Sequence, residues 1–377
     1  MKLTTAGESH GKALVAIIEG LPAHLALDVE QINEALALRQ SGYGRGARQK
    51  IERDTVEILT GVRNQETLGS PVTLCIYNRD YENWKSSMAA EPCDGEAMQK
   101  KALTKVRPGH ADLTGMLKFD QTDARNILER ASARETAIRV AAGQVYRQYL
   151  AALGVEIGGL VREVCGIKDD GAYAFDELKK VTPLGMLDEN ASALAQAKID
   201  ELKKAGDTSG GVVEIRVRGL KSGFGSVMTY ADKLDSQLSA GLMSIQATKG
   251  VEIGAGFAVA HTSGKDIHDE IFYDERTGFY RNTNRAGGIE GGMSNGEEIV
   301  LRVAMKPIPT LMKGLQTVEF NTKAAATAAS ERSDVCAIFA FKVIAESVVA
   351  QVLADAVHTR LGGDTMAQVK ARYKDLP

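Results

Sequence analysis

The chain has 377 residues, of which 44% are hydrophobic and 25% charged, as in ordinary globular proteins. A net charge of −3 and an aromatic content of 5% argue against a nucleic-acid surface built on cations and stacking rings. The four cysteines form no Cys-x-x-Cys pair, which excludes dithiol and zinc-ribbon motifs and indicates free thiols in a reducing cytoplasm. Neither a signal-peptide pattern nor an apolar run near the ~20 residues that cross a bilayer is present, so no membrane contact is expected.

Hydrophobic periodicity predicts the elements of the first half of the chain. Strands are expected at 11–20, 55–62 and 71–77. Helices are expected at 28–38 and 122–153. Asp28 is the expected N-cap of the first helix. The basic, Gly-rich segment 39–53 is predicted to be a loop, because closely spaced glycines disfavour helix and strand alike. Segment 78–112, rich in charge and turn residues, is expected to be irregular and mobile.

Apolar runs predict the elements of the second half in the same way. Strands are expected at 155–165, 212–217, 251–260 and 298–305. Helices are expected at 190–205, 232–245 and 335–361. No fixed-period repeat and no Pro/Ser-rich linker divides the chain, so we expect a single domain over 1–377 with long loops. Its core is expected over 1–365, and 366–377 is expected to be a polar tail.

Two histidines are candidate acid–base groups. The stretch Gly7–Pro22 places Ser9 and His10 in a turn before an apolar run, where a buried strand would hold the turn rigidly. His10 titrates near neutral pH, and His110 is flanked by small residues that leave it open to a pocket. Each histidine taken alone is also compatible with an ordinary surface residue. No His-x-x-x-His spacing is present, so no metal site is expected.

Arginines concentrate in or beside Gly-rich loops, and their planar forks suit phosphate and carboxylate groups. These loop arginines are Arg39, Arg45, Arg48, Arg53 and Arg107. On the expected helix 122–153, Arg130 and Arg134 are spaced i, i+4 and should project from one face. The alternative is that the loop arginines are solvated and the helix arginines pair with Glu129 and Glu135.

Three further features bear on the chemistry. Ser9 and Ser132 lack the Gly-x-Ser-x-Gly context of a hydrolase nucleophile. The glycines of 287–296 fit neither a Rossmann fingerprint nor a P-loop, although they suit a loop whose backbone approaches a ligand. Asp334 either caps the helix that follows it or serves as a site carboxylate, with Arg332 as a phosphate ligand.

Three segments together resemble the chorismate synthase family: Gly7–Pro22, Glu129–Gly143 and Arg332–Val348. They occur in the family's order, and weaker similarities extend the resemblance over nearly the whole chain. The resemblance implies an enzyme that converts 5-enolpyruvylshikimate 3-phosphate to chorismate by anti-1,4-elimination of phosphate and a ring hydrogen. Reduced FMN is required, although there is no net redox change. An α+β fold is also implied, a β-α-β sandwich with helices between antiparallel sheets, assembled as a homotetramer.

The matching motifs also imply site residues. The flavin contacts would be Arg130, Ala131, Ser132, Gln246, Ala247, Gly291, Lys306, Pro307, Ile308, Pro309, Thr310 and Arg332. The substrate phosphate and carboxylates would be surrounded by Ser9, Arg39, Arg45, Arg48, Arg107 and Arg134, together with His10. Arg39 and Arg45 are also the family's NADPH contacts. At Gln246 many members have Asn, so this chain departs from the family pattern there.

The resemblance and the charges suggest catalytic roles for His10, His110 and Asp334. His10 would protonate the leaving phosphate, and His110 would protonate the reduced flavin near N1. Asp334 would assist removal of the ring hydrogen through flavin N5. NADPH would be an indirect reductant, with reduced FMN supplied by an external flavin reductase. The alternatives are a flavin-dependent oxidoreductase of another family and a nucleic-acid binder, the latter suggested by the Arg/Gly segment 42–48.

Overall fold

A four-stranded antiparallel sheet forms one face of the molecule, in the order β1-β2-β6-β3. Its strands are β1 (Lys2–Ala6), β2 (Ala13–Glu19), β3 (Glu57–Thr60) and β6 (Val72–Tyr77). On β2 the buried residues Leu14, Ala16 and Ile18 alternate with more exposed ones, so one face of the sheet is apolar and packs inward. The computed structural model describes residues 1–46, 53–328 and 333–377.

A five-stranded antiparallel sheet forms the opposite face, in the order β10-β15-β9-β7-β8. Its strands are β7 (Glu156–Val164), β8 (Ile167–Lys168), β9 (Gly211–Arg218), β10 (Thr248–Ile253) and β15 (Ile299–Met305). Along β15 every second residue is buried, beginning with Ile299, Leu301 and Val303, which is the pattern of a strand with one face on the core.

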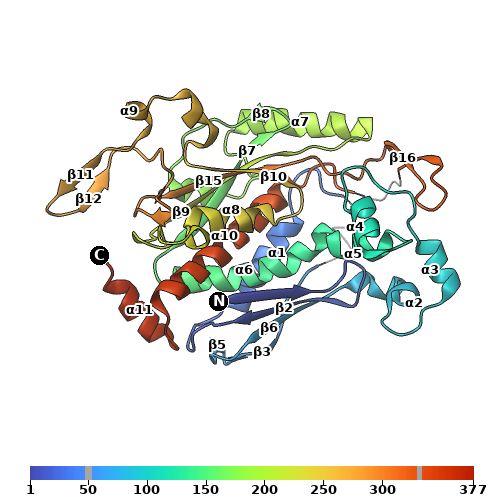
Figure 1. Cartoon of the computed structure of the whole chain (residues 1–377), viewed down its shortest axis with the longest axis horizontal. Helices are drawn as coiled ribbons and strands as arrows, with labels where there is room; N and C mark the ends of the chain where they lie inside the picture. Colours follow the sequence, from blue (N-terminus) through green and yellow to red (C-terminus); the bar gives the residue numbers. More distant parts are fainter. Residues whose placement is uncertain (47–52, 329–332) are drawn as a thin grey trace.

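Three long helices fill the space between the sheets, as Figure 1 shows. They are α1 (Val29–Gln40), α6 (Thr136–Ala151) and α10 (Ile338–Leu361). Helix α6 packs on the first sheet and α10 on the second, and a Cβ at Gly143 of α6 would lie 2.3 Å from the Cβ of Ser347 on α10. Only a glycine therefore allows this close approach of the two helices. The expected arrangement of helices between antiparallel sheets, and the α+β class, are confirmed.

Shorter elements surround this framework. The helices are η2 (Arg79–Asn83), α2 (Lys85–Met88), α3 (Gly95–Lys101), α4 (Asp112–Phe119), α5 (Arg125–Ala131), η3 (Ala133–Glu135), η4 (Phe175–Lys179), α7 (Glu189–Ala205), η5 (Tyr230–Asp232), α8 (Leu234–Met243), η6 (Gly256–His261), α9 (Gly264–Ile267) and α11 (Met366–Lys374). The paired short strands are β4 (Val62–Arg63) with β5 (Glu66–Thr67), β11 (Ile271–Asp274) with β12 (Gly278–Arg281), β13 (Ile289–Glu290) with β14 (Met293–Ser294), and β16 (Gln316–Val318) with β17 (Ala325–Thr327). No helix in the described ranges is long and apolar enough to cross a membrane.

The structure corrects three expectations about the elements. The helix expected over 122–153 is broken at Ser132, where the backbone is extended and the hydroxyl accepts from the Arg134 amide. Segment 78–112 is not irregular but carries four short helices, η2, α2, α3 and the start of α4. The final residues are not a polar tail, because helix α11 buries Met366, Val369 and Tyr373 against the core.

Two strand predictions need smaller corrections. The strand expected at 251–260 begins at Thr248 and ends at Ile253, after which η6 follows. Glu214 on β9 alternates with apolar residues, yet it is buried, because Arg162 and Arg216 pair with its carboxylate. Strand β1 was not predicted at all, since its Thr-rich sequence has no apolar periodicity.

Candidate active site

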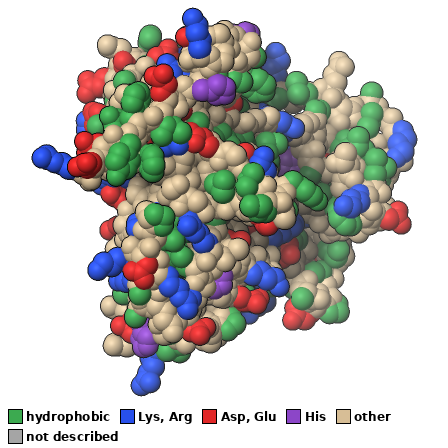
Figure 2. Space-filling view, turned by 60° about the vertical axis from the view of Figure 1, so that its left-hand side comes forward, with side chains coloured by type: hydrophobic (Ala, Val, Ile, Leu, Met, Phe, Trp, Pro, Cys, Tyr) green, Lys and Arg blue, Asp and Glu red, His purple; other side chains and the backbone are tan. Residues whose placement is uncertain are grey.

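A cavity of about 680 Å³ lies at the end of the helix layer where α1 ends and α6 and α10 begin. This volume is ordinary for a small-molecule site. Figure 2 shows the molecule deeply hollowed between its main body and a smaller lobe at the right. The described residues lining the cavity include Ser9, His10, Arg39, Arg45, Gly46, Arg107, Gly109, His110, Ala131, Ser132, Ala133, Arg134, Gln246, Ala247, Lys306, Ile308, Pro309, Thr310, Met312, Ser333, Asp334 and Phe341.

The break between α5 and α6 shapes one wall of this cavity. Ser132 leaves the helical conformation and its Oγ lies 3.3 Å from the Oγ of Ser9 in the β1–β2 turn. Because the helix does not continue through Ser132, Arg130 and Arg134 do not share a face, contrary to the i, i+4 expectation. Arg134 is part of the cavity wall. Arg130 is not, and it donates instead to the backbone carbonyls of Thr5 and Gly7.

His10 is buried in the turn after β1 and is fixed by a carboxylate. Its Nδ1 lies 2.9 Å from Oε1 of Glu129, and its backbone amide donates to Oε2 of the same residue at 2.7 Å. The Trp84 ring stacks on the imidazole with centroids 4.0 Å apart. Burial raises the pKa of Glu129, but the hydrogen bonds from His10 and the charge of Arg125 outweigh it, so this pKa lies below its usual value.

His110 is fixed in a similar way by Asp112. Its Nδ1 lies 2.5 Å from Oδ1 of Asp112, and Arg107 donates from Nε to Oδ2 at 2.8 Å and from Nη2 to Oδ1 at 3.0 Å. Burial raises the pKa of the Asp112 carboxyl, but the hydrogen bonds from His110 and Arg107 outweigh it, so this pKa lies well below its ordinary value. Arg107 also donates to Thr310 at 3.3 Å, which joins this loop to the opposite wall.

Arg39 and Arg134 converge on one buried carboxylate, Asp54. Arg134 donates from Nη1 to Oδ2 of Asp54 at 2.6 Å and from Nε to Asn78 at 3.0 Å. Arg39 lies 3.7 Å from the same Oδ2 and donates to Thr136. Burial lowers the pKa of Arg39 to about 9, with Asp54 opposing the shift. These bonds fix both guanidinium groups before any ligand binds.

Asp334 faces the cavity and is not the cap of the last long helix. Helix α10 begins at Ile338, and its N-cap, Ala337, makes no side-chain capping bond. The Asp334 carboxylate instead accepts from the Gly46 amide at 2.6 Å and pairs with Arg45 at 3.2 Å. Of the two interpretations left open by the sequence, the structure therefore favours a carboxylate in the cavity wall over a helix cap.

The far wall comes from the segments after α8 and β15. Gln246 donates to Glu135 at 3.3 Å, and its buried Oε1 has no hydrogen-bond partner in the described residues. Ala247 has φ of +71°, a left-handed conformation that is uncommon outside glycine and often marks a functional site. Lys306 reaches across to the carbonyl of Gly109, and burial lowers the pKa of this lysine.

The lining carries an excess of positive groups. The described lining residues include four arginines, one lysine and two histidines, against the single carboxylate of Asp334. The balancing carboxylates stand directly behind the lining, as Asp54, Asp112 and Glu129. Such an arrangement orients cations toward the cavity while limiting the cost of burying them, which suits an anionic ligand.

Comparisons with known proteins identify the family. The chorismate synthase family model matches residues 1–358. A chorismate synthase of Geobacter metallireducens is 52% identical over 99% of this chain and 97% of its own length, and one of Caldicellulosiruptor bescii is 49% identical over 99% and 98%. A crystal structure of a chorismate synthase is 38% identical, covers 99% of this chain and 96% of its own, and superimposes with a TM-score of 0.76. The chain belongs to the chorismate synthase family.

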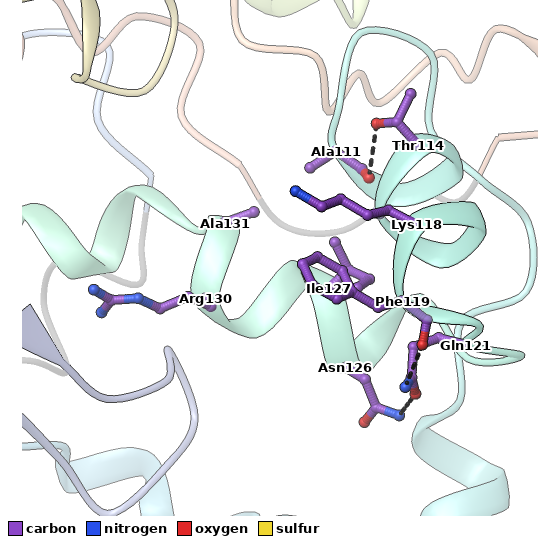
Figure 3. Close-up of a pocket in the computed structure, with 10 residues that line it drawn as sticks. Ala111, Thr114, Lys118, Phe119, Gln121, Asn126, Ile127, Arg130 and Ala131 are labelled. Atoms are coloured by element: carbon purple, nitrogen blue, oxygen red, sulfur yellow. Dashed lines mark hydrogen bonds between the residues drawn. The ribbon is translucent and has the colours of Figure 1, made fainter.

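Not every residue expected from the chorismate synthase motifs lies at this cavity. Pro307 and Gly291 are absent from its lining. Gly291 lies in the turn between β13 and β14, and the next residue, Gly292, packs on Lys233 just before α8. Arg48 and Arg332 lie outside the described residues. Arg130 lines instead a neighbouring cavity of about 620 Å³ between α4 and α5, where Figure 3 shows Lys118 and Phe119 with Ile127.

Five residues that hold side chains of the cavity in place were not predicted as part of the site: Asp54, Asn78, Trp84, Asp112 and Glu129. In the alternative interpretation Glu129 was a partner for Arg130 or Arg134, but it pairs with Arg125 and also holds His10. Asp112 could have been found, because it stands two residues after His110 in a turn-rich segment. The others come from distant parts of the chain.

Proposed function

We propose that the cavity binds 5-enolpyruvylshikimate 3-phosphate and reduced FMN and catalyses the anti-1,4-elimination that gives chorismate. The reaction is that of a carbon–oxygen lyase acting on phosphate, the last common step of the shikimate pathway to the aromatic amino acids. The observation that carries the proposal is the concentration of cations around one cavity in a chain that belongs to the chorismate synthase family.

The substrate's charge matches the lining. One phosphate and two carboxylates bring roughly four negative charges at neutral pH. Arg45, Arg107 and Arg134 present forks suited to these groups, and Arg39 and Ser9 complete the proposed substrate contacts, with Arg48 from the segment outside the described residues. Since Asp54 and Asp112 already hold three of these arginines in place, little side-chain entropy is lost when the anion binds.

The residues present also fit a flavin. Ala131, Ser132 and Ala133 are small and line the cavity next to the helix break, so a flat ring system can lie against this wall. The buried Oε1 of Gln246, without a partner among the described residues, suits an N–H donor such as a flavin pyrimidine edge carries. Ala247 and the segment 306–310 would complete the flavin contacts. Reduced FMN would lend electron density to the substrate and recover it, so that no net redox change results.

Three titratable groups of the chain would handle protons. His10, protonated on both ring nitrogens, would donate its Nε2 proton to the leaving phosphate, because its Nδ1 is held by Glu129 while the residue lines the cavity. His110, held by Asp112 and next to Arg107, would keep a proton at the flavin side of the cavity. Asp334, paired with Arg45, would assist removal of the ring hydrogen.

Assembly and cofactor supply complete the proposal. We infer a homotetramer, supported by exposed apolar side chains that a monomer would leave in water. They are Met228, Tyr230, Phe257, Ile271, Tyr273 and Phe279. Ile271, Tyr273 and Phe279 lie on the β11–β12 hairpin, and Figure 2 shows hydrophobic patches on the side of the molecule that carries it. NADPH would act as the indirect reductant through an external flavin reductase or at Arg39 and Arg45. Arg45 keeps Nε without a hydrogen-bond partner in the described part of the chain.

An anaerobic assay tests the proposed function. The protein is mixed with 5-enolpyruvylshikimate 3-phosphate, with and without reduced FMN, and chorismate absorbance is followed. We expect product only with reduced flavin, and many turnovers for each flavin. Consumption of one NADPH per product would instead indicate an oxidoreductase, and absence of product with reduced flavin present would contradict the proposal.

A further inference from the structure

Glu129 makes more bonds to the turn that carries His10 than a structural ion pair requires. Its backbone carbonyl accepts from the Ser9 amide at 2.9 Å, and its carboxylate accepts from the His10 amide at 2.7 Å. The same carboxylate contacts Nδ1 of His10 through both oxygens, at 2.9 and 3.0 Å. Glu129 is 2% exposed, so these bonds form away from competing water.

The carboxylate determines which ring nitrogen carries a proton. An ionised carboxylate can only accept hydrogen bonds, so Nδ1 of His10 must be a donor. This leaves Nε2 as the nitrogen that can exchange a proton with a ligand, and within the described residues Nε2 has no hydrogen-bond partner. Without the carboxylate, neutral imidazole prefers no particular nitrogen strongly enough to fix this arrangement.

The ring is also held against rotation. The Trp84 ring lies against the imidazole, tilted by 30°, and Nζ of Lys101 lies 3.9 Å from the centroid of the Trp84 ring. Arg125 lies 3.3 Å from Oε1 of Glu129 and 5.1 Å from the Trp84 ring. The other charged groups lining the cavity with His10 are Arg39, Arg45, Arg107, His110, Arg134, Lys306 and Asp334.

We propose that Glu129 is a positioning residue that keeps one proton of His10 on Nδ1, so that the imidazolium gives its second proton, on Nε2, to the substrate phosphate and is left as the Nδ1–H form. The inference rests on the proposed role of His10 as the acid for the leaving phosphate. Burial raises the pKa of Glu129, but its bonds to His10 and the charge of Arg125 lower it below its usual value. Trp84 keeps the imidazole in the plane that the carboxylate selects. Glu129 does not itself touch the reacting atoms.

The first test compares Glu129→Gln with Glu66→Gln. The exposed His24–Glu66 pair has the same Nδ1-to-carboxylate contact, at 3.1 Å, but lies outside the cavity lining, so it is the matched control. Nitrogen NMR of labelled histidines at about pH 8 shows which ring nitrogen is protonated. We expect His10 of the wild type in the Nδ1–H form and of Glu129→Gln in a mixture with the Nε2–H form. Glu66→Gln should leave the His10 signals unchanged. Unchanged His10 signals in folded Glu129→Gln protein would overturn the proposal.

The second test measures turnover on the same variants with reduced FMN. We expect kcat of Glu129→Gln to fall ~10- to 100-fold with little change in KM, because the substrate's cationic contacts are intact. Glu129→Asp, which retains the charge, should recover part of the loss and serves if Glu129→Gln fails to fold. A normal kcat in Glu129→Gln beside an inactive His10→Ala would overturn the positioning role. Wild-type turnover in His10→Ala would instead show that the proposed function of His10 is wrong.

Discussion

The two histidines of the cavity are held by carboxylates in the same manner but over very different distances along the chain. His110 and Asp112 are two residues apart, whereas His10 and Glu129 are 119 apart. The first pair forms as soon as the loop before α4 has folded. The second exists only after α5 has docked on the turn between β1 and β2. The geometry of His10 is therefore coupled to the whole fold, and that of His110 mainly to its own loop.

The two pairs also differ in what surrounds them. Arg107 donates to Asp112 through three nitrogens, counting its backbone amide, so this carboxylate is part of a compact salt bridge. Among the described residues, Glu129 accepts from Arg125 at 3.3 Å and more closely from the backbone amide and ring of His10, at 2.7 and 2.9 Å. Asp112 thus holds Arg107 in the cavity wall as much as it holds His110. This difference separates variants that should mainly change stability from variants that should mainly change turnover.

The largest effect is expected for Asp112→Asn, on stability. Removing this charge breaks the buried ion pair of Arg107 with Asp112 and should lower the free energy of unfolding by about 3 kcal/mol at neutral pH. The folded-state pKa of Asp112 lies below its ordinary value of 3.8. Its contribution is therefore complete above that value and is lost as pH falls further. Urea unfolding at several pH values should show the difference from wild type shrinking below about pH 4. A difference that stays constant at every pH would contradict this account.

The next largest effect is expected on the turnover of His10→Ala and His110→Ala. If both histidines transfer protons, each substitution should lower kcat by ~10²-fold or more. The temperature of thermal unfolding should change much less than for Asp112→Asn. His24→Ala, which removes an exposed histidine paired with Glu66, is the control and should keep full activity. Turnover within a few-fold of the wild type in either cavity variant would remove that histidine from the mechanism and break the parallel between the pairs.

The sequence predicted local features of this fold better than remote ones. Helix α1 begins after Asp28, whose side chain accepts from the amides of Glu30 and Gln31, as expected of an N-cap. The break at Ser132 was missed because apolar spacing continues across it. The Ser-x-x-Glu pattern from Ser132 to Glu135 marks a helix start there, although the apolar periodicity runs across it. Capping chemistry is the more local signal, and here it was the correct one.

The same difference between local and remote features applies to the residues of the cavity. The cations and histidines could be selected from the sequence because their residue types and Gly-rich surroundings suit anionic ligands. Their buried partners could not, since the contact of Arg134 with Asp54 spans 80 residues and depends on how the first sheet meets the helix break. Nothing local to Asp54 or Glu129 distinguishes it from a solvated carboxylate. Sequence analysis therefore finds the groups that meet a ligand sooner than the groups that hold them.

The smallest effect is expected for Trp84→Ala, and it tests the asymmetry between the histidines most directly. Trp84 stacks on His10, while no described aromatic side chain stacks on His110. An aromatic contact of this kind contributes about 0.5–1.5 kcal/mol, which corresponds to at most a roughly tenfold fall in kcat if orientation of His10 limits the rate. Trp84→Phe should retain most of the activity because a ring remains. In the same NMR experiment the His10 signals should shift and the His110 signals should not. Equal shifts at both histidines would show that the two pairs respond as one unit. The His10–Glu129 pair would then depend on its packing no more than the His110–Asp112 pair does.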